Sequence, residues 1–226
     1  MSGPGRAGRG LWLPGRPRPG RRRAGGDRPA GGAAAGGGAP GAPEPEGGRA
    51  AGAGRAGAPA VQVRRARHGD LDAVVALFAS VAAEGRWIAA EAPIDRGLRR
   101  RQLRERLDRR DAAMFVAEVG GVIVGQLVVD LAGYGVAEVG MLVAAEWRRR
   151  GVGSALLGAG IAWAREAGAH KVALQVWPHN QAAITLYERF GFQREGLLRR
   201  HYRRRNGELW DALVMGLPLD RPTPAG

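Results

Sequence analysis

The spacing of apolar residues predicts a folded region over about residues 61 to 220 of the chain, beginning with one strand and two helices. Val61 to Arg64 alternates apolar and polar residues as a strand does. Asp70 to Val81 then carries an apolar stripe at helical spacing. In Ile94 to Arg110 leucines recur amid arginines, which predicts a second helix with one narrow buried face and a solvated charged face.

The rest of this region reads as short strands separated by two more helices. Apolar and β-branched runs predict strands at residues 113–119, 122–131, 136–143 and 171–176. Gly120-Gly121 and Asn206-Gly207 are hairpin turn dipeptides, and the second of them predicts two final strands. Helices are expected from Val152 to Gly168 and over Gln181 to Arg189. The order is β-α-α-β-β-β-α-β-α-β-β, and periodicity alone supports an α/β or α+β domain.

A basic, glycine-punctuated turn joins the strand ending at Val143 to the next helix. Its residues are Arg148, Arg149, Arg150, Gly151, Val152, Gly153 and Ser154. The first N–H groups of a helix have no partner within the helix and carry the positive end of its dipole, so they can bind a pyrophosphate through the main chain. Glycines allow close approach, and arginines supply charge. By itself the pattern also fits a solvated basic loop before a helix.

A second block, Asn180 to Phe192, contains an Asn at the start of an expected helix and Tyr187 seven residues later. Seven residues are about two helical turns, so both side chains lie on one side of the helix. Taken alone, Asn180 reads as a helix N-cap and Tyr187 as a core aromatic with its hydroxyl at the rim.

Together the two blocks resemble the GNAT superfamily of N-acetyltransferases. Arg148-x-x-Gly151-x-Gly153 is similar to the signature that binds the pyrophosphate of acetyl-CoA, and Asn180 to Phe192 is similar to the later cofactor and catalytic motif. The resemblance covers roughly residues 61 to 218. It implies a mixed, mostly antiparallel sheet, flanked by helices and splayed where acetyl-CoA enters. It also implies direct transfer of an acetyl group from the thioester of acetyl-CoA to an amine.

Residue roles follow from the resemblance. The pantetheine arm adds to the strand before the turn, so Met141, Leu142 and Val143 are expected to bind it through main-chain hydrogen bonds, although they also read as a buried strand. Asn180 is expected to contact acetyl-CoA, and Tyr187 to protonate the departing thiolate. Glu138 is the proposed general base, acting directly or through water; its alternative is a charge at a strand edge.

The acceptor amine is less determined than the donor. Related ribosomal-protein N-acetyltransferases carry a Glu five residues before the motif Asn, but Gln175 stands here and an amide is not a base. Glu84, Trp87 and Glu91 are expected to bind a cationic amine. The arginines near Asn206 are an alternative site for an acceptor carboxylate. A small-molecule amine such as an amino acid is the first choice, a protein N-terminus or lysine the second.

Residues 1–60 differ in composition from the rest. They hold 19 of the 38 glycines and almost no large apolar residues, which predicts a disordered Gly/Ala/Pro/Arg-rich tail before a domain at 61–220. Our hypothesis is that residues 1 to about 58 are translated upstream sequence from a misplaced start codon. Half of the net charge of +14 lies in this tail. Trp12 is its one aromatic residue, so we expect no specific nucleic-acid binding.

Other classes of protein find little support. The chain has no cysteine, its four histidines show no metal-binding spacing, and no apolar run approaches the length of a membrane span. A cytoplasmic enzyme without a metal or a membrane partner is therefore expected. A non-catalytic acetyl-CoA-binding module and a basic nucleic-acid-binding protein are the alternatives from other classes. Homodimers are common in the superfamily, which leaves self-association open.

Overall fold

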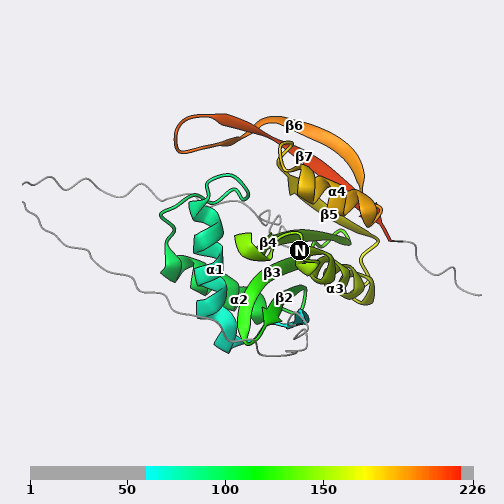
Figure 1. Ribbon diagram of the computed structural model, residues 1–226. Helices are drawn as coiled ribbons and strands as arrows, with labels where there is room; N and C mark the ends of the chain where they lie inside the picture. Colours follow the sequence, from blue (N-terminus) through cyan, green and yellow to red (C-terminus); the bar gives the residue numbers. More distant parts are fainter. Residues whose placement is uncertain (1–59, 220–226) are drawn as a thin grey trace, which may run out of the picture. The chain divides into compact units, whose positions relative to one another are not determined.

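The computed structural model describes residues 60–219, and its elements follow the expected order (Figure 1). The expectations for the preceding tail fall outside the described residues. The elements are β1 (Gln62–Arg65), α1 (Leu71–Ala83), α2 (Arg96–Leu107), β2 (Ala112–Val119), β3 (Val122–Leu131), β4 (Val136–Val143), α3 (Val152–Glu166), β5 (Lys171–Val176), α4 (Gln181–Arg189), β6 (Gln193–Arg203) and β7 (Leu209–Pro218).

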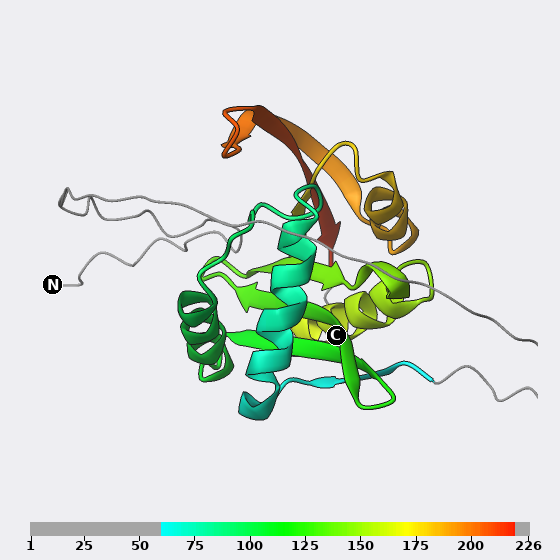
Figure 2. The same cartoon turned by 60° about the vertical axis from the view of Figure 1, so that its left-hand side comes forward.

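The strands form one sheet of seven in the order β1-β2-β3-β4-β5-β7-β6. Only β4 and β5 pair in parallel, and every other neighbouring pair is antiparallel. The expected mixed, mostly antiparallel sheet is confirmed. The two helices α1 and α2 cover one face, while α3 lies on the other, and Figure 2 shows α1 running across the front of the sheet.

The central strands are buried on both faces because helices cover both. In β2, Phe115 and Ala117 belong to the core cluster that includes α3, whereas Met114 and Val116 belong to the cluster with α1. Alternate residues of a strand point to opposite faces, so an uninterrupted apolar run is what a doubly covered strand requires. This run is the reason why the sequence shows no polar alternation there.

The second helix is shorter than its apolar pattern predicted. The Asp95 carboxylate accepts a hydrogen bond from the Leu98 backbone N–H at 2.8 Å, which caps α2 and fixes its start at Arg96. The helix ends before the C-cap Asp108. Residues 84–95 therefore form a connecting loop between α1 and α2, one that the sequence assigned partly to a helix.

The strands β4 and β5 diverge soon after they meet. Their pairing covers three residue pairs and stops at Glu138 and Ala173. Beyond that point β4 continues to Val143 paired only with β3, and β5 continues to Val176 paired only with β7. The sheet is therefore splayed where the resemblance implied, and the far end of β4 presents an edge without a partner strand.

No helix within residues 60–219 is both long enough and apolar enough to cross a membrane.

Candidate active site

A cavity of about 860 Å³ lies in the splay between β4 and β5. Eleven of the residues proposed from the sequence line it: Trp87, Met141, Leu142, Val143, Arg148, Arg149, Gly151, Gly153, Ser154, Asn180 and Tyr187. Five proposed residues do not line it: Glu84, Glu91, Glu138, Arg150 and Val152. The sequence motifs therefore converge on one place, while the proposed acidic residues stay outside it.

The N-terminus of α3 lines this cavity with the glycines of the predicted anion-binding turn. Gly151 is the N-cap residue and has a positive φ of 84°, a conformation that favours glycine, and no heavy atom lies within 4 Å of where its Cβ would be. Gly153 packs closely instead: a Cβ there would lie 3.1 Å from Leu186 and 3.5 Å from Met141. Gly151 thus allows the turn, and Gly153 allows α3 to pack closely against β4 and α4.

The first arginine of the motif is engaged by the protein. The Arg148 guanidinium donates to the Glu84 carboxylate at 2.7 Å and to the Val143 carbonyl at 3.1 Å. This contact lowers the pKa of Glu84, so the pair stays ionised at neutral pH. Arg148 therefore shapes the loop, and its charge is largely compensated.

Two other residues of the motif have side chains away from the cavity. Arg150 is exposed and stacks on Trp147, with its guanidinium carbon 5.2 Å from the ring centroid. Val152 is 1% exposed and packs in the main core. Only the backbone groups of Arg150 and Val152 are therefore left for a role in cofactor binding. The Val152 side chain is buried because it lies on the apolar face of the amphipathic helix α3. Arg149 lines the cavity and has a positive φ of 58°.

The free edge of β4 is made by alternate residues. The Ala144 N–H donates to Val124 of β3 at 2.9 Å, and the register between β3 and β4 has no shift. In an antiparallel pair the main-chain groups point alternately to the two sides, so those of Leu142 also face β3. The groups of Met141 and Val143 face the splay. Main-chain contact by Leu142 is therefore not supported, although its side chain lines the cavity.

Tyr187 lies inside the cavity on α4 and is 7% exposed. Burial raises the pKa of its phenol to about 12, because a phenolate is poorly solvated there. The hydroxyl therefore remains protonated at neutral pH, as a general acid must be before it acts. Its ring packs on Phe192 at a centroid distance of 5.7 Å, so Tyr187 is also the core aromatic residue that the sequence predicted.

Asn180 caps α4 and lines the cavity at the same time. Its side-chain oxygen accepts a hydrogen bond from the Ala183 N–H at 3.2 Å. The N-cap reading is confirmed, and the two-turn spacing brings Asn180 and Tyr187 to the same cavity. An amide has two N–H donors besides this oxygen, so capping leaves it able to bind a second group.

Glu138 occupies the last paired position of β4 before the splay. By strand alternation its side chain shares a sheet face with Leu142, which packs in the cluster containing α1 residues. Its carboxylate accepts a hydrogen bond from the Tyr134 hydroxyl at 3.2 Å. The structure thus places Glu138 beside the splay, on the face of the α1–α2 loop. Its role as a base stays a prediction.

The two carboxylates expected to bind the acceptor already have partners within the protein. Glu84 binds Arg148 and also accepts from the Trp87 indole N–H at 2.6 Å. Glu91 accepts from the Arg205 backbone N–H at 2.9 Å and lies 3.3 Å from the Arg204 guanidinium. Direct binding of a cationic amine by these carboxylates is not supported, because each already has a cationic or N–H partner. Trp87 does line the cavity.

Sequence reasoning missed the aromatic and amide groups of the acceptor side. Trp177 and Tyr202 line the cavity with their rings 4.9 Å apart, and the Tyr202 hydroxyl donates to Gln175 at 2.9 Å. Ile88 and Ala89 of the α1–α2 loop line it too. Gln175 stood at a motif position and could have been included. Ile88, Ala89 and Tyr202 lie in the loop and the hairpin to which the sequence assigned the acceptor, but the sequence did not show that the fold brings them together with Trp177.

The comparisons with known proteins agree with this geometry. The sequence model of the Acetyltransferase (GNAT) family matches residues 82–192. An N-alpha-acetyltransferase of Sulfurisphaera tokodaii is 35% identical over 129 residues, which cover 51% of this chain and 74% of that protein. The chain belongs to the GNAT family. This GNAT enzyme is also 37% identical over 120 residues to the L-amino acid N-acetyltransferase AaaT of Escherichia coli, covering 49% of this chain and 72% of that one.

Solved structures give the same fold. The structure of yncA from Salmonella typhimurium with its cofactor acetyl-CoA has a TM-score of 0.62 and 22% identity, covering 73% of this chain and 98% of that one. The present chain is an acetyl-CoA-dependent N-acetyltransferase of the GNAT family. Its residues fit that co-substrate, since a helix N-terminus, an unpaired strand edge and a buried phenol open on one cavity.

Proposed function

We propose that the acetyl acceptor is the primary amine of a small molecule, an amino acid or a compound like it. The observation that carries this proposal is the acceptor side of the cavity. Its walls are apolar and aromatic, from Ile88, Leu142, Trp177 and Tyr202, and no Asp or Glu is among the lining residues that the structure describes. A pocket of this kind suits a neutral or aromatic side chain next to the reacting amine.

In the proposed reaction, the N–H groups at the start of α3 bind the pyrophosphate, and the main chain of Met141 and Val143 binds the pantetheine arm. One N–H of this β4 edge polarises the thioester carbonyl. The acceptor nitrogen attacks the carbonyl carbon while the carbon–sulfur bond breaks. Glu138 takes the proton from the nitrogen, directly or through water, and Tyr187 gives its proton to the leaving sulfur.

A protein acceptor, at an N-terminus or a lysine, is the second candidate. The observation in its favour is the similarity to the N-alpha-acetyltransferase of Sulfurisphaera tokodaii. Against lysine stands the ordinary pKa of its amine, about 10.4, because a strongly protonated amine needs a nearby carboxylate to bind and deprotonate it. The α-amine of a protein N-terminus, with a pKa of about 8, needs less help.

Free CoA release by the full-length protein, measured with a panel of amino acids, polyamines and short peptides, tests the proposal. We expect release with amino acids that carry apolar or aromatic side chains, and little with polyamines. Tyr187→Phe is the control, since release catalysed at this site must fall in that variant. If peptides are acetylated and no free amino acid is, the acceptor is instead a protein.

A further inference from the structure

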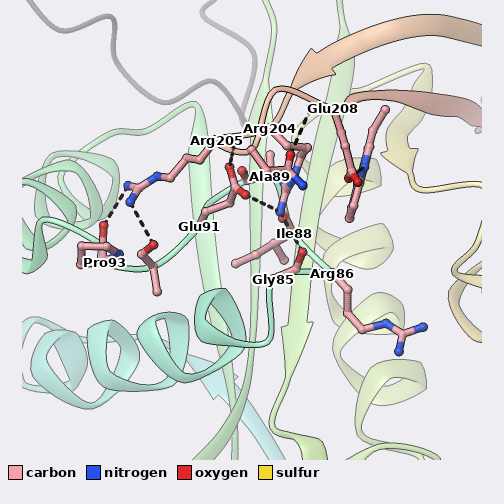
Figure 3. A network of polar contacts seen from close by, with 12 residues as sticks. Gly85, Arg86, Ile88, Ala89, Glu91, Pro93, Arg204, Arg205 and Glu208 are labelled. Atoms are coloured by element: carbon pink, nitrogen blue, oxygen red, sulfur yellow. Dashed lines mark hydrogen bonds and ion pairs between the residues drawn. The ribbon is translucent and has the colours of Figure 1, made fainter.

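Arg204 is a buried cation at the tip of the β6–β7 hairpin. It is 3% exposed, and its nearest carboxylate, that of Glu91, lies 3.3 Å from the guanidinium. Burying an arginine is costly unless its N–H groups find partners. Figure 3 shows that these partners come from the α1–α2 loop, more than one hundred residues earlier in the chain.

Three loop carbonyls accept hydrogen bonds from this one guanidinium. The distances are 2.9 Å to Gly85, 3.3 Å to Ile88 and 3.2 Å to Ala89. The neighbouring Arg205 binds the next part of the loop, donating to the carbonyls of residues 92 and 93 at 2.9 and 3.0 Å. The rigid planar fork of arginine fixes several acceptors at once, so it defines the loop conformation more closely than a lysine could.

The Arg204 guanidinium also lies against the rings of Trp210 and Trp177, and Trp177 lines the cavity. The guanidinium carbon lies 4.3 Å from the Trp210 ring centroid and 5.8 Å from that of Trp177. Trp177 in turn packs edge-on against Trp210 and Tyr202, at 5.3 and 4.9 Å. Arg204 thus connects two parts of the cavity wall: the loop residues Ile88 and Ala89, and the aromatic group.

We propose that Arg204 is a positioning residue for the acceptor amine. It touches neither reacting group; it holds the backbone of residues 85–91 against Trp177 and Trp210, and so sets the width of the acceptor side of the cavity. None of its side-chain partners belongs to β4 or to the α3 N-terminus, so it acts on the cofactor side only indirectly, through the Glu84–Arg148 pair that precedes the loop. This inference rests on the acceptor site proposed above.

The test compares Arg204→Met with Arg199→Met in the full-length protein. Met retains much of the volume of the side chain and removes every donor, while Arg199 is an exposed arginine of β6. We expect Arg204→Met to raise the KM for the acceptor about ten- to a hundredfold, because a displaced wall misplaces the amine. The Kd for acetyl-CoA should change by less than about twofold, and Arg199→Met should behave as the wild type.

Amide hydrogen exchange provides a readout that needs no acceptor. Exchange at residues 85–92 should accelerate in Arg204→Met, while that at residues 151–158 should not change. The proposal is overturned if loop exchange stays at the wild-type rate, or if acetyl-CoA binding weakens as much as acceptor binding. A wild-type enzyme that finds no acceptor in the panel contradicts the proposed function instead, and leaves the exchange result to decide the role of Arg204.

Two milder variants cover the case in which Arg204→Met does not fold. Arg204→Lys keeps the charge and loses the fork, and Glu91→Gln keeps the shape of the carboxylate and loses its charge. Both should move the acceptor KM in the same direction, by about two- to tenfold. An unchanged acceptor KM in both, with wild-type loop exchange, would also overturn the proposal.

Discussion

The two sides of the cavity are built in different ways. On the proposed cofactor side, the groups available for binding are main-chain atoms of one continuous segment, the end of β4 and the start of α3. On the acceptor side, side chains from the α1–α2 loop, the end of β5 and the β6–β7 hairpin meet through long-range contacts. One side therefore tolerates changes of side chain that keep its backbone, whereas the other depends on which side chains are present.

This difference explains why one enzyme fold can keep a donor and change its acceptor. A pyrophosphate bound by backbone N–H groups needs a turn geometry and two glycines, but no particular charged side chain. The acceptor wall consists of rings and paired charges, and each replacement there alters its shape or polarity. Variants on each side of the cavity test whether binding of the donor and binding of the acceptor can be changed independently.

The largest expected effect belongs to Tyr187, which lies where the two sides meet. Tyr187→Phe removes the acid and keeps the ring, so kcat should fall by about 10²- to 10⁴-fold. The Kd for acetyl-CoA, measured by isothermal titration, should remain near the wild-type value, because the ring and its packing on Phe192 are retained. A kcat within about threefold of the wild type would remove Tyr187 from the chemistry.

A valine at Gly153 should damage the cofactor side alone. Its branched side chain meets Leu186 and Met141, whose atoms already lie 3.1 and 3.5 Å from the position of a Cβ, so α3 must move away from β4. We expect the Kd for acetyl-CoA to rise about a hundredfold. Gly158→Val is the matched control in the same helix, where the nearest heavy atom lies 4.0 Å from the Cβ position. Equal losses in both variants would indicate general helix damage.

Glu84→Gln should affect both sides of the cavity, because Glu84 joins Arg148 of the cofactor loop to Trp87 of the acceptor loop. Losing this pair should raise the KM for both substrates by about two- to fivefold. Glu105→Gln, on the exposed surface of α2, is the control. Arg148 lowers the pKa of Glu84, so the pair is fully formed above the ordinary carboxyl pKa, and its contribution to stability is lost as pH falls from that value to the lowered pKa. A change in one KM only would show that Glu84 serves a single side.

How much the sequence could predict follows the same division. The strands β3, β4 and β5 and the helix α4 end where their patterns predicted, because local periodicity and turn residues determine them. The turn at Gly151 could be predicted equally well from the sequence. The partners of Glu84, Glu91 and Arg204 could not be predicted. The sequence gives the sign of each charged side chain, but not which partner the fold places beside it.

The smallest expected effect is the pH response of Tyr187. Burial raises its pKa to about 12 from an ordinary value of about 10, so kcat at saturating substrate should stay level between about pH 8 and pH 10. Above about pH 10 the unfolded chain ionises this phenol while the folded enzyme keeps it protonated, so stability falls as pH rises toward about 12, by up to about 1.4 kcal/mol per pH unit. Denaturant unfolding of Tyr187→Phe should show a shallower decline in that window. Identical declines in the two proteins would mean that the Tyr187 phenol is solvated in the folded enzyme and ionises there as it does in the unfolded chain.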